Sequence, residues 1–195
     1  MIGSKKFMLT VFWNTEGFII IDLLPEGLKF NSEYFITNIL EKIYQMTSDL
    51  GLKSRCKITL HFDNARVHTA RKVIQFMDLH QMKRASHPPF STDIAASDFY
   101  LFGFLKDRLA GQAFESADEL FEGIAQILSK IPQETLINVF HEWEERLRQV
   151  IEKMVNTYNK KYFNNIQFIF NCTLRCYDIL GQPIFLKLFE NGIKK

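Results

Sequence analysis

The sequence predicts an α/β fold in which helices flank a mixed β-sheet. Two β-rich runs joined by a turn open the chain, and helical and strand patterns then alternate up to about residue 86. From about residue 97 to residue 153 the periodicity is helical only. The length of 195 residues and the hydrophobic content of 47% suit one globular domain with a substantial core.

The first predicted element is an antiparallel hairpin. Residues 6–13 (KFMLTVFW) and 18–24 (FIIIDLL) are rich in β-branched and aromatic residues, and residues 14–17 (NTEG) between them are typical of a turn. Pro25 ends the second strand, because proline cannot donate to a strand ladder.

Four further elements are expected to alternate after the hairpin. They are a helix over 33–50 with Asn31 or Ser32 as its N-cap, a buried strand over 57–62, a helix over 69–80 and a short strand over 82–86. A hairpin followed by strands that alternate with helices indicates a mixed α/β sheet.

The remaining predicted elements are helices. The pattern indicates one over 97–110, one that Ser116 opens and one that begins at Pro132 and extends to about residue 153. Residues 154–195 differ in composition, with many Phe, Ile, Lys, Asn and Tyr residues. We therefore divide the chain into a domain over 1–153 and a divergent tail over 154–195, for which no element is predicted.

Composition excludes several classes of protein. Three cysteines are too few for a disulfide scaffold, and no apolar run is long enough to cross a bilayer. The expected location is therefore inside the cell: the nucleus in a eukaryote, otherwise the cytoplasm. The net charge of +2 indicates no particular partner, although residues 113–153 hold 9 acidic and 4 basic residues, typical of a solvated helix surface.

Asp63 is the first candidate for a chemical role. It follows the buried strand over 57–62, and ligands in open α/β sheets gather beyond the carboxyl ends of strands. The alternative is that Asp63 and Asn64 only turn the chain, since both residue types stabilise turns. His61, His68 and His87 are expected to be packed or loop residues rather than metal ligands.

Asp98 is the second candidate. In a helix it heads a stripe that is otherwise apolar, formed by Leu101, Phe102, Leu105 and Leu109. A carboxylate facing inward needs compensation, and a metal ion can supply it; the alternative is that Asp98 only caps the helix. Two carboxylates that converge from a strand end and a helix start could hold Mg²⁺, and two such ions can drive phosphodiester chemistry.

Two segments resemble the catalytic motifs of a known family. Residues 61–68 (HFDNARVH) and 87–111 (HPPFSTDIAASDFYLFGFLKDRLAG) are similar to the second and third catalytic-acid motifs of mariner-type transposases. The interval agrees as well, since 34 residues lie between Asp63 and Asp98. Residues 5–25 resemble the hairpin that precedes these motifs, and residues 140–153 resemble the closing helix.

The resemblance implies an RNase H-like catalytic domain that cuts and rejoins transposon ends. In the family, three aspartates hold Mg²⁺ or Mn²⁺, so Asp63 and Asp98 would be catalytic metal ligands. The implied partner is transposon-end DNA, and a homodimer is compatible with the family. No membrane and no small-molecule substrate are implied.

This chain also departs from the family pattern. The family's first aspartate lies on a strand before the hairpin, and helix-turn-helix modules precede it; neither is found here, and Asp22 lies on the wrong strand to substitute. We therefore expect an RNase H-like sheet that lacks its first strand, so that the strand over 6–13 either exposes an unpaired edge or pairs with another chain. The predicted function is an amino-terminally truncated catalytic domain, a DNA transposition enzyme by resemblance that is inactive alone. The alternatives are a non-catalytic module that binds DNA or transposase, and an unrelated α/β nuclease or phosphatase.

Overall fold

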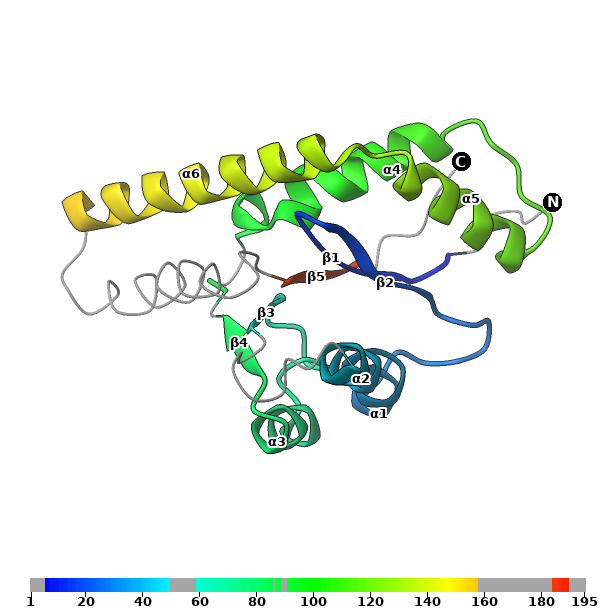
Figure 1. Cartoon of the computed structure of the whole chain (residues 1–195), viewed down its shortest axis with the longest axis horizontal. Coiled ribbons are helices and arrows are strands. Elements are labelled where there is room, and N and C mark those ends of the chain that lie inside the picture. Colours follow the sequence, from blue (N-terminus) through cyan, green and yellow to red (C-terminus); the bar gives the residue numbers. More distant parts are fainter. Residues whose placement is uncertain (1–5, 50–58, 86, 89–90, 158–183, 190–195) are drawn as a thin grey trace.

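A computed structural model of the chain describes residues 6–49, 59–85, 87–88, 91–157 and 184–189. The described strands form one mixed sheet of five strands between two layers of helices (Figure 1). The strand order is β2-β1-β5-β3-β4. The strands are β1 (Leu9–Asn14), β2 (Gly17–Leu23), β3 (Thr59–His61), β4 (Lys83–Ala85) and β5 (Ile184–Phe189).

The predicted hairpin is confirmed. Strands β1 and β2 pair antiparallel, from Leu9 opposite Leu23 to Asn14 opposite Gly17. The Asn14 side chain fixes the turn, since its Oδ1 accepts hydrogen bonds from the backbone N–H groups of Glu16 (2.9 Å) and Gly17 (3.1 Å). Gly17 has a φ of 148°, a conformation that glycine adopts without strain.

The expectation of an unpaired edge on β1 is wrong. On the side away from β2, β1 pairs antiparallel with β5, from Leu9 opposite Phe189 to Trp13 opposite Phe185. All residues of β1 are buried, so an open edge there would leave backbone groups without partners. The sequence pattern did not predict β5, which lies in the tail over 154–195; in the structure it pairs with β3 as well, in parallel.

One helical layer covers the sheet face that carries Phe12, Leu60 and Phe62. The predicted helix over 33–50 is present as three consecutive helical segments, and Asn31 is confirmed as its N-cap because its side chain accepts from the Tyr34 N–H at 2.8 Å. The helices of this layer are α1 (Ser32–Phe35), the π-helical turn η1 (Ile36–Leu40), α2 (Glu41–Asp49) and α3 (Arg71–Leu79).

The second layer covers the opposite face, where Val11 and Trp13 are buried. Its helices are the 3₁₀ turn η3 (Thr92–Ile94), the π-helical turn η4 (Ser97–Leu101), α4 (Phe102–Leu109), α5 (Ala117–Ser129) and α6 (Gln133–Thr157). Ser116 caps α5 as predicted, accepting from the Glu119 N–H at 3.1 Å. No helix in the described ranges has the length and apolarity to span a membrane.

Candidate functional site

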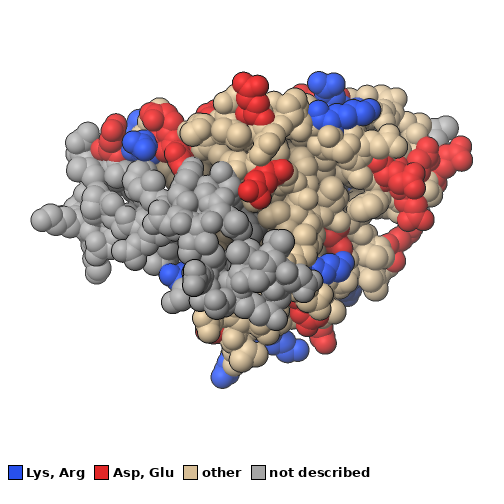
Figure 2. Space-filling model, viewed as in Figure 1, with Lys and Arg blue, Asp and Glu red and all other residues tan. Residues whose placement is uncertain are grey.

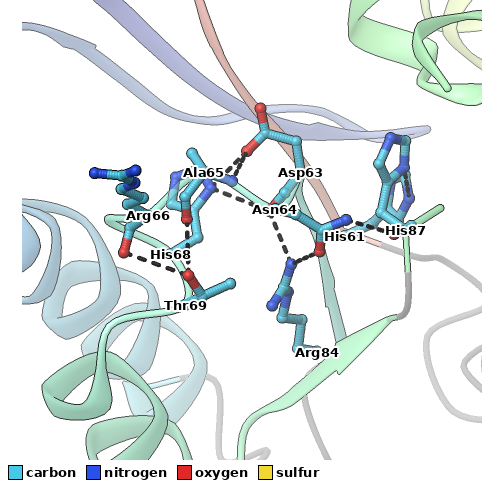
Figure 3. A network of polar contacts seen from close by, with 9 residues as sticks. All are labelled: His61, Asp63, Asn64, Ala65, Arg66, His68, Thr69, Arg84 and His87. Atoms are coloured by element: carbon cyan, nitrogen blue, oxygen red, sulfur yellow. Dashed lines mark hydrogen bonds and ion pairs between the residues drawn. The ribbon is translucent and has the colours of Figure 1, made fainter. Parts of the chain in front are cut away.

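Asp63 lies directly beyond the carboxyl end of β3, and its carboxylate is held by two N–H donors (Figure 3). Its Oδ1 accepts from the backbone N–H of Ala65 at 3.0 Å and lies 2.9 Å from Nδ1 of His68. The first contact is the turn-forming role that the sequence left open. The second holds the carboxylate in a fixed orientation while 29% of the Asp63 side chain remains exposed.

His68 is buried completely beneath Asp63. Its ring lies 4.8 Å from the rings of both Phe35 and Phe62, measured between centroids. Because an ionised carboxylate can only accept, Nδ1 carries the proton that is shared with Asp63. Nε2 is buried without a hydrogen-bond partner among the described residues. Nδ1 therefore orients the acid, while the rest of the ring packs as an apolar group.

The sequence predicted the loop position of His68 but not its contact with Asp63. Five residues separate the two, which is neither a helical nor a strand repeat, so periodicity gives no signal for it. The contact depends on the turn over 66–69, where the His68 and Thr69 N–H groups donate to the Ala65 carbonyl and the chain turns back beneath the strand end.

A guanidinium ties the same loop to the neighbouring strand β4. Nη2 of Arg84 donates to the Asp63 carbonyl at 2.8 Å and to Oδ1 of Asn64 at 2.6 Å (Figure 3). Nδ2 of Asn64 donates in turn to the carbonyl of His87 at 2.7 Å. Burial lowers the pKa of Arg84, and the Asp63 charge opposes that shift. Through these two hydrogen bonds the Arg84 guanidinium fixes the backbone of Asp63 and the side chain of Asn64.

Two histidines pack on the opposite side of the β3 end. Nδ1 of His87 and Nε2 of His61 are 3.2 Å apart, so one ring donates a proton that the other accepts. Both residues are buried, and the His61 ring centroid lies 5.7 Å from that of Trp143 on α6. The prediction that His61 is packed and hydrogen-bonded is confirmed.

Asp98 occupies the first turn of η4, at the head of the predicted apolar stripe. The stripe is confirmed, because Leu101, Phe102, Leu105 and Leu109 are each at most 5% exposed whereas Asp98 is partly exposed. The start of η4 is anchored to the sheet by Ser97, whose Oγ accepts from Nε1 of Trp13 at 2.9 Å.

The two candidate acids belong to elements that meet the same central strand. Asp63 follows β3, which pairs with β5, and Asp98 belongs to η4, which packs against β5. Within the described parts of the chain, no group of three or more His, Cys, Asp and Glu side chains is close enough to hold a metal ion. Two carboxylates alone would leave most coordination positions of a hard cation to water, which Mg²⁺ usually retains.

Asp22 stands apart from these acids on β2, in agreement with its exclusion as a substitute ligand. The Tyr34 hydroxyl donates to its Oδ2 at 2.9 Å. Burial, the largest cause, raises the pKa of Asp22, whereas the hydrogen bond from Tyr34 and the charge of Lys42 oppose the rise. Burial and Asp22 together raise the pKa of Tyr34, so the hydroxyl stays protonated.

The raised pKa of Asp22 predicts a stability change with pH. The folded chain holds this proton more tightly than the unfolded chain, so the contribution of Asp22 is present at acid pH and is lost as pH rises through the folded pKa. We expect Asp22→Asn, which removes the titration, to gain stability relative to the wild type between acid and neutral pH. Urea unfolding across this range measures the difference. In Tyr34→Phe an NMR titration should show a higher Asp22 pKa; an unchanged pKa would contradict this account.

Comparison with known proteins identifies the relatives of this fold. Residues 2–55 match a family described as "Transposase (partial DDE domain)". The chain is 27% identical over 151 residues to the Mariner Mos1 transposase of Drosophila mauritiana, covering 76% of this chain and 44% of that protein. It is 28% identical over 120 residues to the human histone-lysine N-methyltransferase SETMAR, covering 61% of this chain and 18% of that protein. The chain thus spans less than half the length of these curated relatives.

Solved structures agree with the sequence matches. The structure of the Mos1 transposase catalytic domain with raltegravir and Mn is similar at a TM-score of 0.67 and 26% identity, covering 75% of this chain and 74% of that one. A Mos1 paired-end complex with the left transposon end is similar at a TM-score of 0.66 and 26% identity, covering 73% and 41%. The chain is therefore similar to the Mos1 mariner transposase, and its fold matches about three quarters of that protein's catalytic domain.

Proposed function

We propose that this chain takes part in mariner-type DNA transposition as a catalytic-domain fragment that binds a divalent cation but does not cut DNA by itself. The observation that carries the proposal is the arrangement around β5, where the elements of Asp63 and Asp98 meet the same strand. Metal is present in related catalytic-domain structures, which contain Mn or Mg. For this chain, Mg²⁺ or Mn²⁺ is the proposed ligand.

The chain's own residues would prepare Asp63 for a cation. His68 and the Ala65 N–H hold one carboxylate oxygen and so fix the direction of the group. Arg84 holds the backbone of the turn in place. A bound Mg²⁺ or Mn²⁺ would polarise a phosphodiester oxygen and lower the pKa of a bound water.

The sequence of β5, the strand that both β3 and η4 contact, argues against cleavage by this chain alone. Strand β5 (IFLKLF) contains no carboxylate. The pairing of β3 with β5 includes His61 opposite Phe185. We infer that the same register, extended by two residues, would put position 187 next to Asp63. A basic residue, Lys187, would then occupy the position next to the candidate metal ligand. Two carboxylates with a cation alongside bind divalent metal weakly, and two-metal chemistry requires more negative charge.

Transposon-end DNA is the proposed partner, with a homodimer as the proposed assembly and the nucleus of a eukaryotic host as the location. On the face shown in Figure 2, acidic side chains gather on the side that carries α5. The exposed acids of this helix and the residues before it are Glu115, Asp118, Glu119 and Glu122. Because DNA is a polyanion, we expect it to avoid this side and to approach the molecule elsewhere.

Metal binding provides the direct test. We expect the wild type to bind Mn²⁺ weakly in titrations followed by electron paramagnetic resonance. Asp63→Asn keeps an acceptor for Ala65 and His68 but removes the charge, so we expect at least a tenfold loss of Mn²⁺ affinity, roughly the scale seen for changes around metal ligands. Asp93→Asn is the matched control, since Asp93 lies near Asp98 in the chain but is exposed and its carbonyl, not its carboxylate, contacts Arg146. Equal affinity in all three proteins would overturn the site.

Cleavage is tested on a transposon-end duplex in Mg²⁺ and in Mn²⁺. We expect no nicking by the wild-type chain. Nicking that requires divalent metal and disappears in Asp63→Ala would contradict the proposal that the fragment is inactive, while confirming the metal-binding role of Asp63.

A further inference from the structure

Strand β5 is the only described connection between two halves of the sheet. The described pairs are β1 with β2 and β3 with β4 on either side, and each half reaches the other through β5 alone. Without β5, β1 and β3 would each present a row of unpaired backbone groups. The space between them is therefore a slot for one strand.

The slot has a defined direction. Its occupant must run antiparallel to β1 and parallel to β3. Pairing with β1 extends from Leu9 opposite Phe189 to Trp13 opposite Phe185, and pairing with β3 includes Leu60 opposite Ile184. A peptide in the reverse direction would run parallel to β1 and antiparallel to β3, so its backbone hydrogen bonds would differ on both edges. The slot therefore selects the direction of its occupant.

The slot also selects composition. Helices cover both faces of the sheet, with Val11 and Trp13 of β1 buried on one face and Phe12 on the other. An interior strand between covered faces requires apolar residues at successive positions rather than in alternation. The sequence of β5, Ile-Phe-Leu-Lys-Leu-Phe, has this character at five of its six positions.

The occupant comes from a separate part of the chain. The other four described strands lie within residues 9–85 and the last described helix ends at Thr157, whereas β5 begins at Ile184. Everything else in the described fold is thus contained in residues 6–157, and the central strand is added from beyond it.

We propose that the slot between β1 and β3 is a strand-binding site for an apolar, extended peptide segment, and that Ile184–Phe189 of the same chain is its resident ligand. Binding occurs by backbone pairing on both edges, as in recognition by strand addition, so the site also accepts the same segment supplied as a free peptide. The proposal concerns strand pairing only, and its tests are independent of metal binding.

Disulfide trapping in the full chain tests the resident ligand. In a background with the native cysteines replaced by serine, Thr10→Cys with Leu188→Cys and Val11→Cys with Lys187→Cys each join residues that are opposite in the register. Opposite residues of an antiparallel pair alternate between a wider and a narrower Cα separation. Two successive pairs therefore include one of each kind, so that both separations are tested for disulfide formation. Thr10→Cys with Phe189→Cys is the control, displaced by one residue. Displacement by one residue puts the two control cysteines on opposite faces of the sheet. We therefore expect at least about tenfold more intramolecular disulfide in the better of the two matched pairs than in the control.

The position of the disulfide decides whether Ile184–Phe189 occupies the slot in its own chain. Intramolecular disulfide in a matched pair supports the assignment of Ile184–Phe189 as resident ligand. Equal trapping in the control, or disulfide only between two chains, would overturn the assignment.

Peptide binding tests the site itself. In the full chain, Leu186→Pro removes a ladder donor from the middle of β5, and we expect the melting temperature to fall by roughly 10 °C. A synthetic peptide of residues 182–191 should restore at least half of this loss and should bind the variant more tightly than the wild type, whose slot is filled. A scrambled peptide is the control. Restoration by neither peptide, or by both equally, would overturn the proposal.

Discussion

Replacement of Lys187 by aspartate is expected to raise the affinity of the chain for Mn²⁺ by at least about tenfold. The pairing of β3 with β5 includes His61 opposite Phe185. Extending this register by two residues, we expect position 187 to lie next to Asp63, so the substitution would exchange a positive charge for a negative one near the candidate ligand. At an effective dielectric constant of 20, two unit charges 4 Å apart interact by about 4 kcal/mol, well above the 1.4 kcal/mol that a tenfold change requires. Binding is measured by titration with Mn²⁺.

Two variants separate the charge from the added ligand. Lys187→Asn removes the positive charge without supplying a carboxylate, and we expect it to gain only part of the affinity. Lys187→Asp combined with Asp63→Asn should lose most of the gain, because the new carboxylate would then lack its partner. An increase that is unaffected by Asp63→Asn would show that the metal binds elsewhere.

Replacement of Trp143 by alanine is expected to lower the free energy of unfolding by about 3–5 kcal/mol. Trp143 is 1% exposed on α6, where it packs beside the rings of Phe140 and His61. Its indole Nε1 donates to the carbonyl of Ile94 at 2.8 Å and so joins α6 to η3, the turn that precedes the helix of Asp98. The alanine variant would lose the ring's packing and leave that buried carbonyl without its donor. Chemical denaturation measures the change.

Trp143→Phe isolates the hydrogen bond, because it keeps most of the packing and removes the donor. We expect a smaller loss of about 1–3 kcal/mol. His141→Ala, on the exposed side of the same helix, should change stability by less than about 0.5 kcal/mol. A Trp143→Ala variant as stable as the His141→Ala variant would contradict the role of Trp143 as the contact that holds α6 on the sheet.

Local patterns predicted several elements of the fold, among them the helix that carries Asp98. The hairpin with its Asn14 turn, the Asn31 cap and the apolar stripe behind Asp98 are all present. Each depends on residues close in the chain, whose periodicity or side-chain chemistry favours one conformation. The motif spacing between Asp63 and Asp98 likewise indicated the family, and the structural similarity to the Mos1 catalytic domain agrees with it.

Contacts between distant residues could not be predicted in this way. The guanidinium of Arg84 behind Asp63, the His61–His87 pair and the contact from Trp143 to Ile94 bring together residues that are 21, 26 and 49 positions apart. No local repeat links such positions. The segments η1 and η4 are π-helical turns where the sequence predicted α-helix. The apolar pattern predicts that a segment is helical but not how many residues each turn contains.

By itself, the sequence determined the hairpin, the Asn31 and Ser116 caps and the apolar stripe behind Asp98, because propensity, capping and amphipathic spacing act over a few residues. Only the tertiary structure decided that a distant segment, Ile184–Phe189, pairs between β1 and β3. The physical reason is that strand pairing satisfies backbone groups, which every residue except proline carries alike. The pairing partners and the register of β5 are therefore set by the buried edges of β1 and β3, and not by a residue pattern within β5 itself.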